Sequence, residues 1–255
     1  MEKNYVSCHG KRMPYFEGGE GRPLVFLHDE TGGVEDSPFL SRLAESFHVI
    51  APIHPGFDEA ERPDWVEDME DMAYYYVDFL SELAIHRPIL TGESLGGWIA
   101  AELAVDYSDR LSQLVLINSL GLKLPGVDYP DVFRLRPAAL ASLRCFRPDW
   151  QEALGKEPEG IALEYYYKNR EMFARLAWSP RMHHPKLRRK IARITAPTLI
   201  LWGKENRVAP PSLAVAWQEG IAGASLVVLE DCGHAATSEQ GEQVALEMSR
   251  ICLQG

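Results

Sequence analysis

The stretch Gly92-Glu93-Ser94-Leu95-Gly96-Gly97 constrains the fold of this chain more than any other segment. It follows a short apolar run, P-I-L, and precedes W-I-A-A-E-L-A-V, which has the composition of a buried helix. Glycines at 92 and 96 remove the side chains that would clash in a tight turn between a strand and a helix. We therefore predict that Ser94 lies on a sharp turn before a helix over 95–105, with its hydroxyl group protruding.

Short apolar runs bounded by turn residues recur along the chain and predict buried strands. Amphipathic patterns with helical period lie between them. This alternation predicts the α/β class, with a mostly parallel sheet and helices on both faces. The chain has 255 residues, 46% of them apolar, which suits one large domain. The predicted strands cover 23–28, 48–53, 88–92, 114–118, 198–203 and 226–230, the predicted helices include 37–47, 69–83 and 243–252, and a hairpin turns at His9-Gly10.

The segment 122–190 has no strand pattern and is rich in aromatic residues. Two amphipathic segments within it, 131–146 and 161–178, have helical spacing. So long a stretch without a strand argues against the eight even strand–helix units of a TIM barrel. We expect a core domain over 1–121 and 191–255 that carries a helical cap, or lid, inserted at 122–190.

Charge and composition limit the partners of the chain. The formal net charge of −11 disfavours a nucleic-acid partner, because phosphate backbones are also negative. No apolar run reaches the length of a membrane span, and no apolar signal segment is found at the start. Four widely spaced cysteines predict reduced thiols. We therefore expect a cytoplasmic protein that acts on a small molecule, with no nucleic-acid or membrane partner; the oligomeric state does not follow from the sequence.

A protruding serine hydroxyl is a poor nucleophile and needs a base beside it. Of eight histidines, His234 is the best placed, because it follows the last predicted strand in L-E-D-C-G-H, on a glycine-marked turn. The carboxyl ends of parallel strands meet at one edge of the sheet, so His234 and Ser94 are expected at the same edge. The pair predicts nucleophilic catalysis by Ser94 with His234 as the base.

Five segments in this order resemble an α/β-hydrolase, and within that family the small bacterial esterases and C–C hydrolases. The segments are H-D-E-T-G-G at 28–33, A-P-I-H-P-G-F at 51–57, G-E-S-L-G-G at 92–97, W-G-K-E-N-R-V-A-P at 202–210 and D-C-G-H at 231–234. The resemblance covers nearly the whole chain and implies the α/β-hydrolase fold. It implies that Ser94 is the nucleophile, that His234 is the base, and that the backbone N–H groups of Glu30 and Leu95 form the oxyanion hole. It implies neither a metal nor an organic cofactor.

The sequence departs from the family pattern at the oxyanion loop. The usual His-Gly pair is His28-Asp29, followed by Glu30. Two carboxylates near an oxyanion would raise its energy if their side chains pointed inward. The oxyanion hole itself uses backbone N–H groups, which allows these side chains to point to water instead.

A second departure concerns the acid that orients the base. The family's Gly-x-x-Asp pattern is Gly203-Lys204-Glu205-Asn206 here, and the other position used by some members is occupied by Asn118. Four readings remain open. Asn206 could accept the Nδ1–H of His234 through its amide oxygen, as asparagine does in Cys-His-Asn sites. Alternatively, Glu205 is the acid, the site is degenerate and binds a ligand, or Asn206 is an engineered replacement of aspartate.

The sequence thus predicts a serine hydrolase that cleaves a small ester or thioester with an apolar portion through an acyl-enzyme on Ser94. The alternatives are a hydrolase of C–C bonds in vinylogous ketones, using the same residues, and a ligand-binding protein without activity. Aromatic residues of the cap are expected to wall an apolar pocket over Ser94, with Phe133, Trp150, Tyr166 and Trp178 as candidates.

Overall fold

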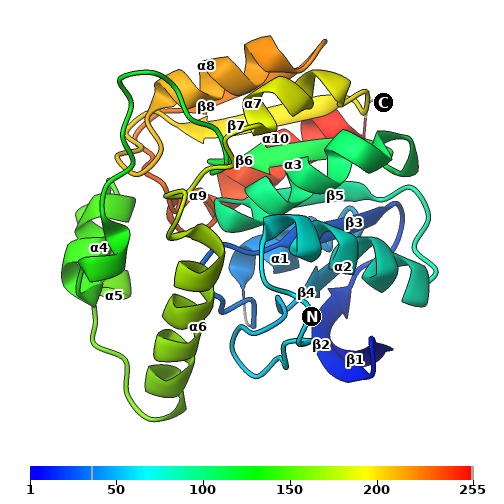
Figure 1. The fold of residues 1–255 in the computed structure, drawn as a ribbon, viewed down its shortest axis with the longest axis horizontal. Coiled ribbons are helices and arrows are strands. Elements are labelled where there is room, and N and C mark those ends of the chain that lie inside the picture. Colours follow the sequence, from blue (N-terminus) through cyan, green and yellow to red (C-terminus); the bar gives the residue numbers. More distant parts are fainter. Residues whose placement is uncertain (36, 254–255) are drawn as a thin grey trace.

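The computed structural model describes residues 1–35 and 37–253, which form an eight-stranded sheet surrounded by helices (Figure 1). The strand order is β1-β2-β4-β3-β5-β6-β7-β8. The first two strands form an antiparallel hairpin, β2 also pairs antiparallel with β4, and all other pairs are parallel. The strands are β1 (Glu2–Cys8), β2 (Lys11–Gly18), β3 (Pro23–Leu27), β4 (His48–Pro52), β5 (Ile89–Glu93), β6 (Gln113–Ile117), β7 (Thr198–Gly203) and β8 (Ser225–Leu229).

The helices cover both faces of this sheet. Two of them, α2 and α3, pack against each other, α8 packs on β7 and β8, and α1 packs against α10. The α-helices are α1 (Pro38–Leu43), α2 (Met69–Glu82), α3 (Leu95–Tyr107), α4 (Pro137–Arg144), α5 (Pro148–Leu154), α6 (Ile161–Ala177), α7 (Leu187–Lys190), α8 (Pro211–Gly220), α9 (Ala236–Glu239) and α10 (Gly241–Cys252). The α/β class and the mostly parallel sheet predicted from the sequence are confirmed.

Most of the predicted elements are found within one or two residues of their expected bounds. The helix expected over 131–146 is wrong, because the chain forms a 3₁₀ turn over 132–134 and only then the helix α4. Arg136 precedes a proline, which disfavours the helical conformation, and it adopts an extended one (φ −75°, ψ 162°). The helix expected over 37–47 is also shorter and ends at Leu43.

Between β6 and β7 the chain leaves the sheet and forms α4, α5 and α6, which stand to one side of it in Figure 1. The chain then returns through α7 and a 3₁₀ turn that packs against α3. Asn169 of α6 connects this helical segment to the core: its Nδ2 donates to Thr31 O (2.8 Å), and its Oδ1 accepts from Asp58 N (2.7 Å). The segment therefore lies over the loop that follows β3.

The turn between β5 and α3 depends on glycine. A Cβ atom at Gly96 would lie 2.0 Å from the carbonyl oxygen of Leu27 and 2.5 Å from that of His28. A Cβ atom at Gly92 would lie 2.2 Å from the carbonyl oxygen of Gly96. Real Cβ atoms do not approach backbone so closely, so α3 can start beside β3 and β5 only with glycine at both positions.

We expect Gly96→Ala to destabilise the protein by about 3 kcal/mol or more, because backbone rather than a mobile side chain must give way. Gly223→Ala is the matched control: Gly223 has a positive φ of 76° but its Cβ would meet nothing within 4 Å. The control should cost about 1 kcal/mol from backbone strain alone. Urea unfolding curves measure both changes, and equal losses for the two variants would contradict this reading of the turn.

Candidate active site

Ser94 lies on the predicted turn in a strained conformation, with φ of 52° and ψ of −111°. The strain costs a residue with a side chain about 1–2 kcal/mol and must be held in place by its surroundings. The Ser94 N–H donates to Ile117 O (2.9 Å), and the Ser94 carbonyl accepts from Leu120 N (3.1 Å). These bonds fix the turn against the end of β6 and hold the serine side chain at the carboxyl edge of the sheet.

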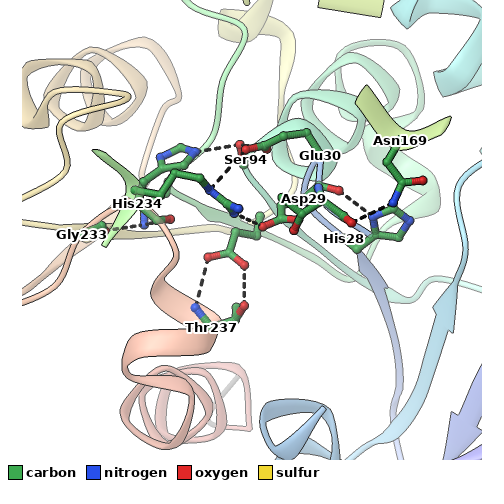
Figure 2. A network of polar contacts seen from close by, with 12 residues as sticks. His28, Asp29, Glu30, Ser94, Asn169, Gly233, His234 and Thr237 are labelled. Carbon is green, nitrogen blue, oxygen red and sulfur yellow. Dashed lines mark hydrogen bonds and ion pairs between the residues drawn. The ribbon is translucent and has the colours of Figure 1, made fainter. Parts of the chain in front are cut away.

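His234 is brought to this serine from the other end of the chain. Its Nε2 lies 2.8 Å from Ser94 Oγ, and Figure 2 shows the two side chains facing each other. The His234 backbone is held on both sides, because its N–H donates to Arg144 O (2.5 Å) and its carbonyl accepts from Asn118 Nδ2 (2.8 Å). Both side chains are fully buried. The residues expected as nucleophile and base are therefore in hydrogen-bond contact.

Asn206 lies on the other side of the imidazole, with its Oδ1 3.2 Å from His234 Nδ1. Its amide orientation is fixed by backbone donors, since Oδ1 also accepts from Val208 N (3.1 Å) and Ala209 N (2.9 Å). An oxygen facing Nδ1 requires the hydrogen of the neutral ring to be on Nδ1. Nε2 is then free to accept the proton of Ser94, which is the form that a general base needs.

Asn118, at the end of β6, holds the loops that carry this site together. Its Nδ2 donates to the carbonyl oxygens of Gly233 (3.1 Å) and His234 (2.8 Å), and its Oδ1 accepts from Gly203 N (3.0 Å). The same Oδ1 accepts from Asn206 Nδ2 (2.9 Å). Asn118 therefore meets the amide side of Asn206 with an acceptor, and a carboxylate at 206 would place two oxygens against each other.

Glu205, the other candidate acid, takes a different position. Its backbone N–H donates to Cys232 O (2.9 Å), and the residue is half-buried beside the buried Asn206. Neighbouring residues in an extended loop point to opposite sides. Since Asn206 contacts His234, we expect the Glu205 carboxylate to point away from it.

The side chains of the oxyanion loop point inward and not to water. Asp29 and Glu30 are both 9% exposed and face Arg144 of α4, which is 5% exposed. One Arg144 Nη contacts an Asp29 carboxylate oxygen, and its Nε lies 3.4 Å from Glu30 Oε1. The guanidinium lies beside both carboxyl groups, and its positive charge allows the Asp29 carboxylate to be buried. Glu30 Oε2 lies 2.6 Å from Ser94 Oγ (Figure 2).

Burial dominates the protonation of these groups. It lowers the pKa of His234 to about 3, with the Arg144 charge acting in the same direction, so the imidazole is neutral. Burial also raises the pKa of Glu30, and the opposing charge of Arg144 does not cancel this effect. For Asp29 burial acts in the same sense, but Arg144 and the hydrogen bonds from Thr31 outweigh it and lower the pKa.

Two buried histidines, His28 and His54, hold the backbone of the loop that carries Glu30. His28 Nδ1–H donates to Asp29 O (2.6 Å), and its Nε2 accepts from His54 N (2.9 Å). His54 Nε2–H donates to His28 O (2.9 Å), and the two rings lie 3.7 Å apart. This arrangement fixes the backbone that carries Glu30.

A cavity of about 350 Å³ opens between α4, α6 and the oxyanion loop. Glu30 lines this cavity and also contacts Ser94 Oγ, so its carboxyl group connects the cavity wall to the serine. Three of the four predicted aromatic residues, Phe133, Tyr166 and Trp178, line this cavity. Trp150 does not; it lines a different cavity beside α1.

One group of possible metal ligands occurs in the described part of the chain, Glu70, Glu102 and His184. Its members already have partners. Lys190 Nζ lies 2.8 Å from Glu70 Oε1, and His184 Nδ1 lies 2.7 Å from Glu102 Oε1. The lysine supplies the positive charge that a metal would bring.

The family model described as "Alpha/beta hydrolase family" matches residues 24–247, and the chain belongs to this family. It is 28% identical to 2-hydroxymuconate semialdehyde hydrolase of Pseudomonas sp. (strain CF600), over 94% of this chain and 90% of that protein. It is 25% identical to Lipase 1 of Psychrobacter immobilis, over 95% of this chain and 81% of that protein. The structure of the enol-lactonase from Burkholderia xenovorans LB400 superposes with a TM-score of 0.81 at 21% identity, covering 98% of this chain and 100% of that one.

These relatives are hydrolases, and the chain is an α/β-fold hydrolase. Its particular reaction and substrate do not follow from the comparisons. Across residues 1–35 and 37–253, none of the helices combines the length and apolar character needed to cross a bilayer.

Sequence reasoning missed two parts of the site. Arg144 lies far from every motif in the sequence, and nothing in its local pattern marks it as the partner of Asp29 and Glu30. The role of Asn118 in joining the loops that carry His234 and Asn206 was also missed. Its place at the end of a strand, beside the turn that carries Ser94, is a signal that could have found it. Both contacts join segments that are distant along the chain.

We expect Asn206→Asp to raise kcat on an activated ester by at least about tenfold. Replacing the triad carboxylate by an amide costs about 10⁴ in a serine protease, or roughly 5 kcal/mol. A carboxylate here should recover only part of this, because it faces Asn118 Oδ1. Glu205→Gln, a control in the same loop, should change kcat little. A collapse of kcat in Glu205→Gln, with no gain in Asn206→Asp, would identify Glu205 as the acid instead.

Proposed function

We propose that this α/β-fold hydrolase is a serine hydrolase that cleaves a small ester or thioester with an apolar portion. The observation that carries the proposal is the buried contact chain from Asn206 Oδ1 to His234 Nδ1 (3.2 Å) and from His234 Nε2 to Ser94 Oγ (2.8 Å). This geometry supplies a nucleophile, a base and a group that orients the base.

The proposed reaction follows from the positions of these atoms. Ser94 Oγ attacks the carbonyl carbon while its proton passes to His234 Nε2, and the carbonyl electrons move onto the carbonyl oxygen. The backbone N–H groups of Leu95 and Glu30 are the proposed donors to this oxyanion. Leu95 is the first residue of α3, so its N–H has no acceptor within the helix and lies at the positive end of the helix dipole. His234 then returns the proton to the leaving group, and water releases the acyl group from Ser94 by the same steps.

The helical segment that contains α4 and α6 acts in this proposal as the cap of the substrate pocket. It contributes Phe133, Tyr166 and Trp178 to the cavity, and these side chains are mainly apolar. Such a lining favours an aryl or medium-chain acyl group over a polar one. A charged substrate group would lose its hydration there without a matching partner.

Cleavage of a C–C bond in a vinylogous ketone is a second candidate, because the 2-hydroxymuconate semialdehyde hydrolase is a relative along most of its length. Both reactions would use Ser94 and His234. Comparison of kcat/KM on aryl esters with kcat/KM on 2-hydroxymuconate semialdehyde separates them: the higher value identifies the reaction for which the pocket is shaped.

A fluorophosphonate probe followed by intact-mass analysis tests the nucleophile. We expect one adduct per chain, located on Ser94 by peptide mapping, and no adduct on Ser94→Ala. Ser94→Ala should keep the thermal unfolding midpoint of the parent within a few degrees, because its hydroxyl contributes little packing. Absence of an adduct on the folded parent protein would favour a ligand-binding role instead of catalysis.

The cavity generates a separate expectation about the acyl group. Two extra buried methylenes are worth about 1.6 kcal/mol, so p-nitrophenyl butyrate should exceed the acetate roughly 15-fold in kcat/KM. Trp178→Ala should reduce this ratio, whereas the matched control Trp150→Ala, which lies at the other cavity, should leave it unchanged. Equal efficiency on both esters would show that the cavity does not bind the acyl group.

A further inference from the structure

The hydrogen-bond chain at Ser94 has one member that the proposed reaction does not use, the carboxyl group of Glu30. Its Oε2 lies 2.6 Å from Ser94 Oγ, while His234 Nε2 lies 2.8 Å from the same oxygen. A hydroxyl group has one proton and can donate to only one of these two neighbours. The other neighbour must therefore donate to Ser94.

The positions of the hydrogens on Asn206 and His234 identify the neighbour that donates to Ser94. Val208 N–H and Ala209 N–H orient Asn206 with its oxygen toward His234, which places the ring hydrogen on Nδ1. In the neutral ring Nε2 is then an acceptor, so Ser94 donates its proton to His234. The lone pair of Ser94 Oγ then accepts a hydrogen bond from Glu30, which requires Glu30 to be a carboxylic acid and not a carboxylate.

The position of Glu30 decides what such an acid can do. Glu30 lines the cavity and contacts Ser94 Oγ, and its backbone N–H is one of the two proposed oxyanion donors. A carbonyl group that reaches Ser94 from this cavity comes close to the Glu30 carboxyl group, because that group contacts both. We propose that Glu30 is a further catalytic residue, which in its carboxylic acid form donates a hydrogen bond to the substrate's carbonyl oxygen as Ser94 attacks. This inference rests on the proposed function of Ser94 as the nucleophile.

The proton stays on Glu30 throughout the step. The serine proton moves to His234, the new bond forms between Oγ and the carbonyl carbon, and the oxyanion accepts hydrogen bonds from the Glu30 O–H and from the two backbone N–H groups. A neutral acid in a buried site is an effective oxyanion donor. It also resolves the conflict between an oxyanion and a nearby acidic residue, because the residue brings a proton and no negative charge.

The surroundings of Glu30 favour the acid form. Burial disfavours the charged carboxylate and raises the pKa of Glu30, and the neighbouring Asp29 carboxylate, held ionised by Arg144, acts in the same sense. The Arg144 charge, the contact with Ser94 and the Glu30 backbone oppose this rise but do not cancel it. The titratable and charged groups around Glu30 are Asp29 of its own loop, Arg144 of α4, Glu93 of β5, His234, and Tyr166, Arg170 and Glu171 of α6 on the cavity wall.

The proposal makes the activity depend on pH in a sense opposite to that of an ordinary serine hydrolase. The pKa of His234 is about 3, so the base remains neutral in mildly acid solution. As the pH rises through the raised pKa of Glu30, the oxyanion donor becomes a carboxylate and the rate falls. The activity is therefore highest on the acid side and declines toward alkaline pH.

Three variants test this, with kcat and KM for an aryl ester measured between about pH 5 and about pH 9. Glu30→Gln keeps a neutral hydrogen-bond donor that does not titrate, so it should hold kcat within a few fold of the acid value of the parent and remove the alkaline decline. Glu30→Ala should lower kcat about 100-fold in acid, with KM little changed, and the parent should approach its rate at alkaline pH. Glu205→Gln, the same substitution in a nearby loop, should keep the profile of the parent.

Several outcomes would overturn the proposal. One is an alkaline decline that persists in Glu30→Gln, and another is a Glu30→Gln variant as slow as Glu30→Ala. A third is a Glu30→Ala variant as fast as the parent or faster, which would show that Glu30 obstructs the pocket. If Glu30→Ala does not fold, the comparison of Glu30→Gln with the parent decides alone. Fluorophosphonate labelling of Ser94 separates a failure of the Glu30 proposal from a failure of the proposed serine-hydrolase function. A labelled parent whose Glu30 variants match it refutes only the role of Glu30, whereas an unlabelled, inactive parent refutes the serine-hydrolase function and this inference with it.

Discussion

The hydrogen bond between His234 and the amide oxygen of Asn206 is the interaction on which the rest of the site depends. A neutral imidazole can point its one hydrogen either way, and only the fixed oxygen of Asn206 makes Nε2 the acceptor that Ser94 needs. The backbone donors of Val208 and Ala209 fix that oxygen. An amide can orient the ring as a carboxylate does, but it offers no negative charge to the imidazolium of the proposed reaction. Asn206 thus orients the ring of His234 but does not stabilise a positive charge on it.

Burial shifts the pKa values of Glu30 and His234, the two neighbours of Ser94, in opposite directions. At His234 it favours the neutral ring, and at Glu30 it favours the neutral acid, so both ends avoid a charge in a site removed from water. The ion pair between Asp29 and Arg144 involves the residue next to Glu30 and does not contact the serine directly. A site with neutral partners around Ser94 suits an apolar pocket, because no fixed charge on these groups has to be desolvated again when a substrate enters.

The helical segment between β6 and β7 lines the cavity and also contacts the loop that carries Glu30. Arg144 of α4 neutralises the oxyanion loop and holds the backbone N–H of His234 through its own carbonyl oxygen. Asn169 of α6 binds the same loop from the other side. Displacement of this segment would therefore change the charge and the geometry at Ser94 as well as the access to it. In the proposed reaction these two side chains would couple the helical segment to the chemistry at Ser94.

The sequence alone determined the class of fold, the sharp turn at Ser94 and the pairing of Ser94 with His234, because these depend on local patterns: buried apolar runs, glycines that a backbone contact requires, and residues at the ends of parallel strands. It left the choice between Asn206 and Glu205 open, because two adjacent polar residues in a loop give no local signal of which one faces inward. The tertiary structure places Asn206 in contact with His234 Nδ1. It also brought Arg144 to the oxyanion loop and turned Glu30 toward Ser94, since these contacts join segments far apart in the chain and are set by packing, burial and charge neutralisation.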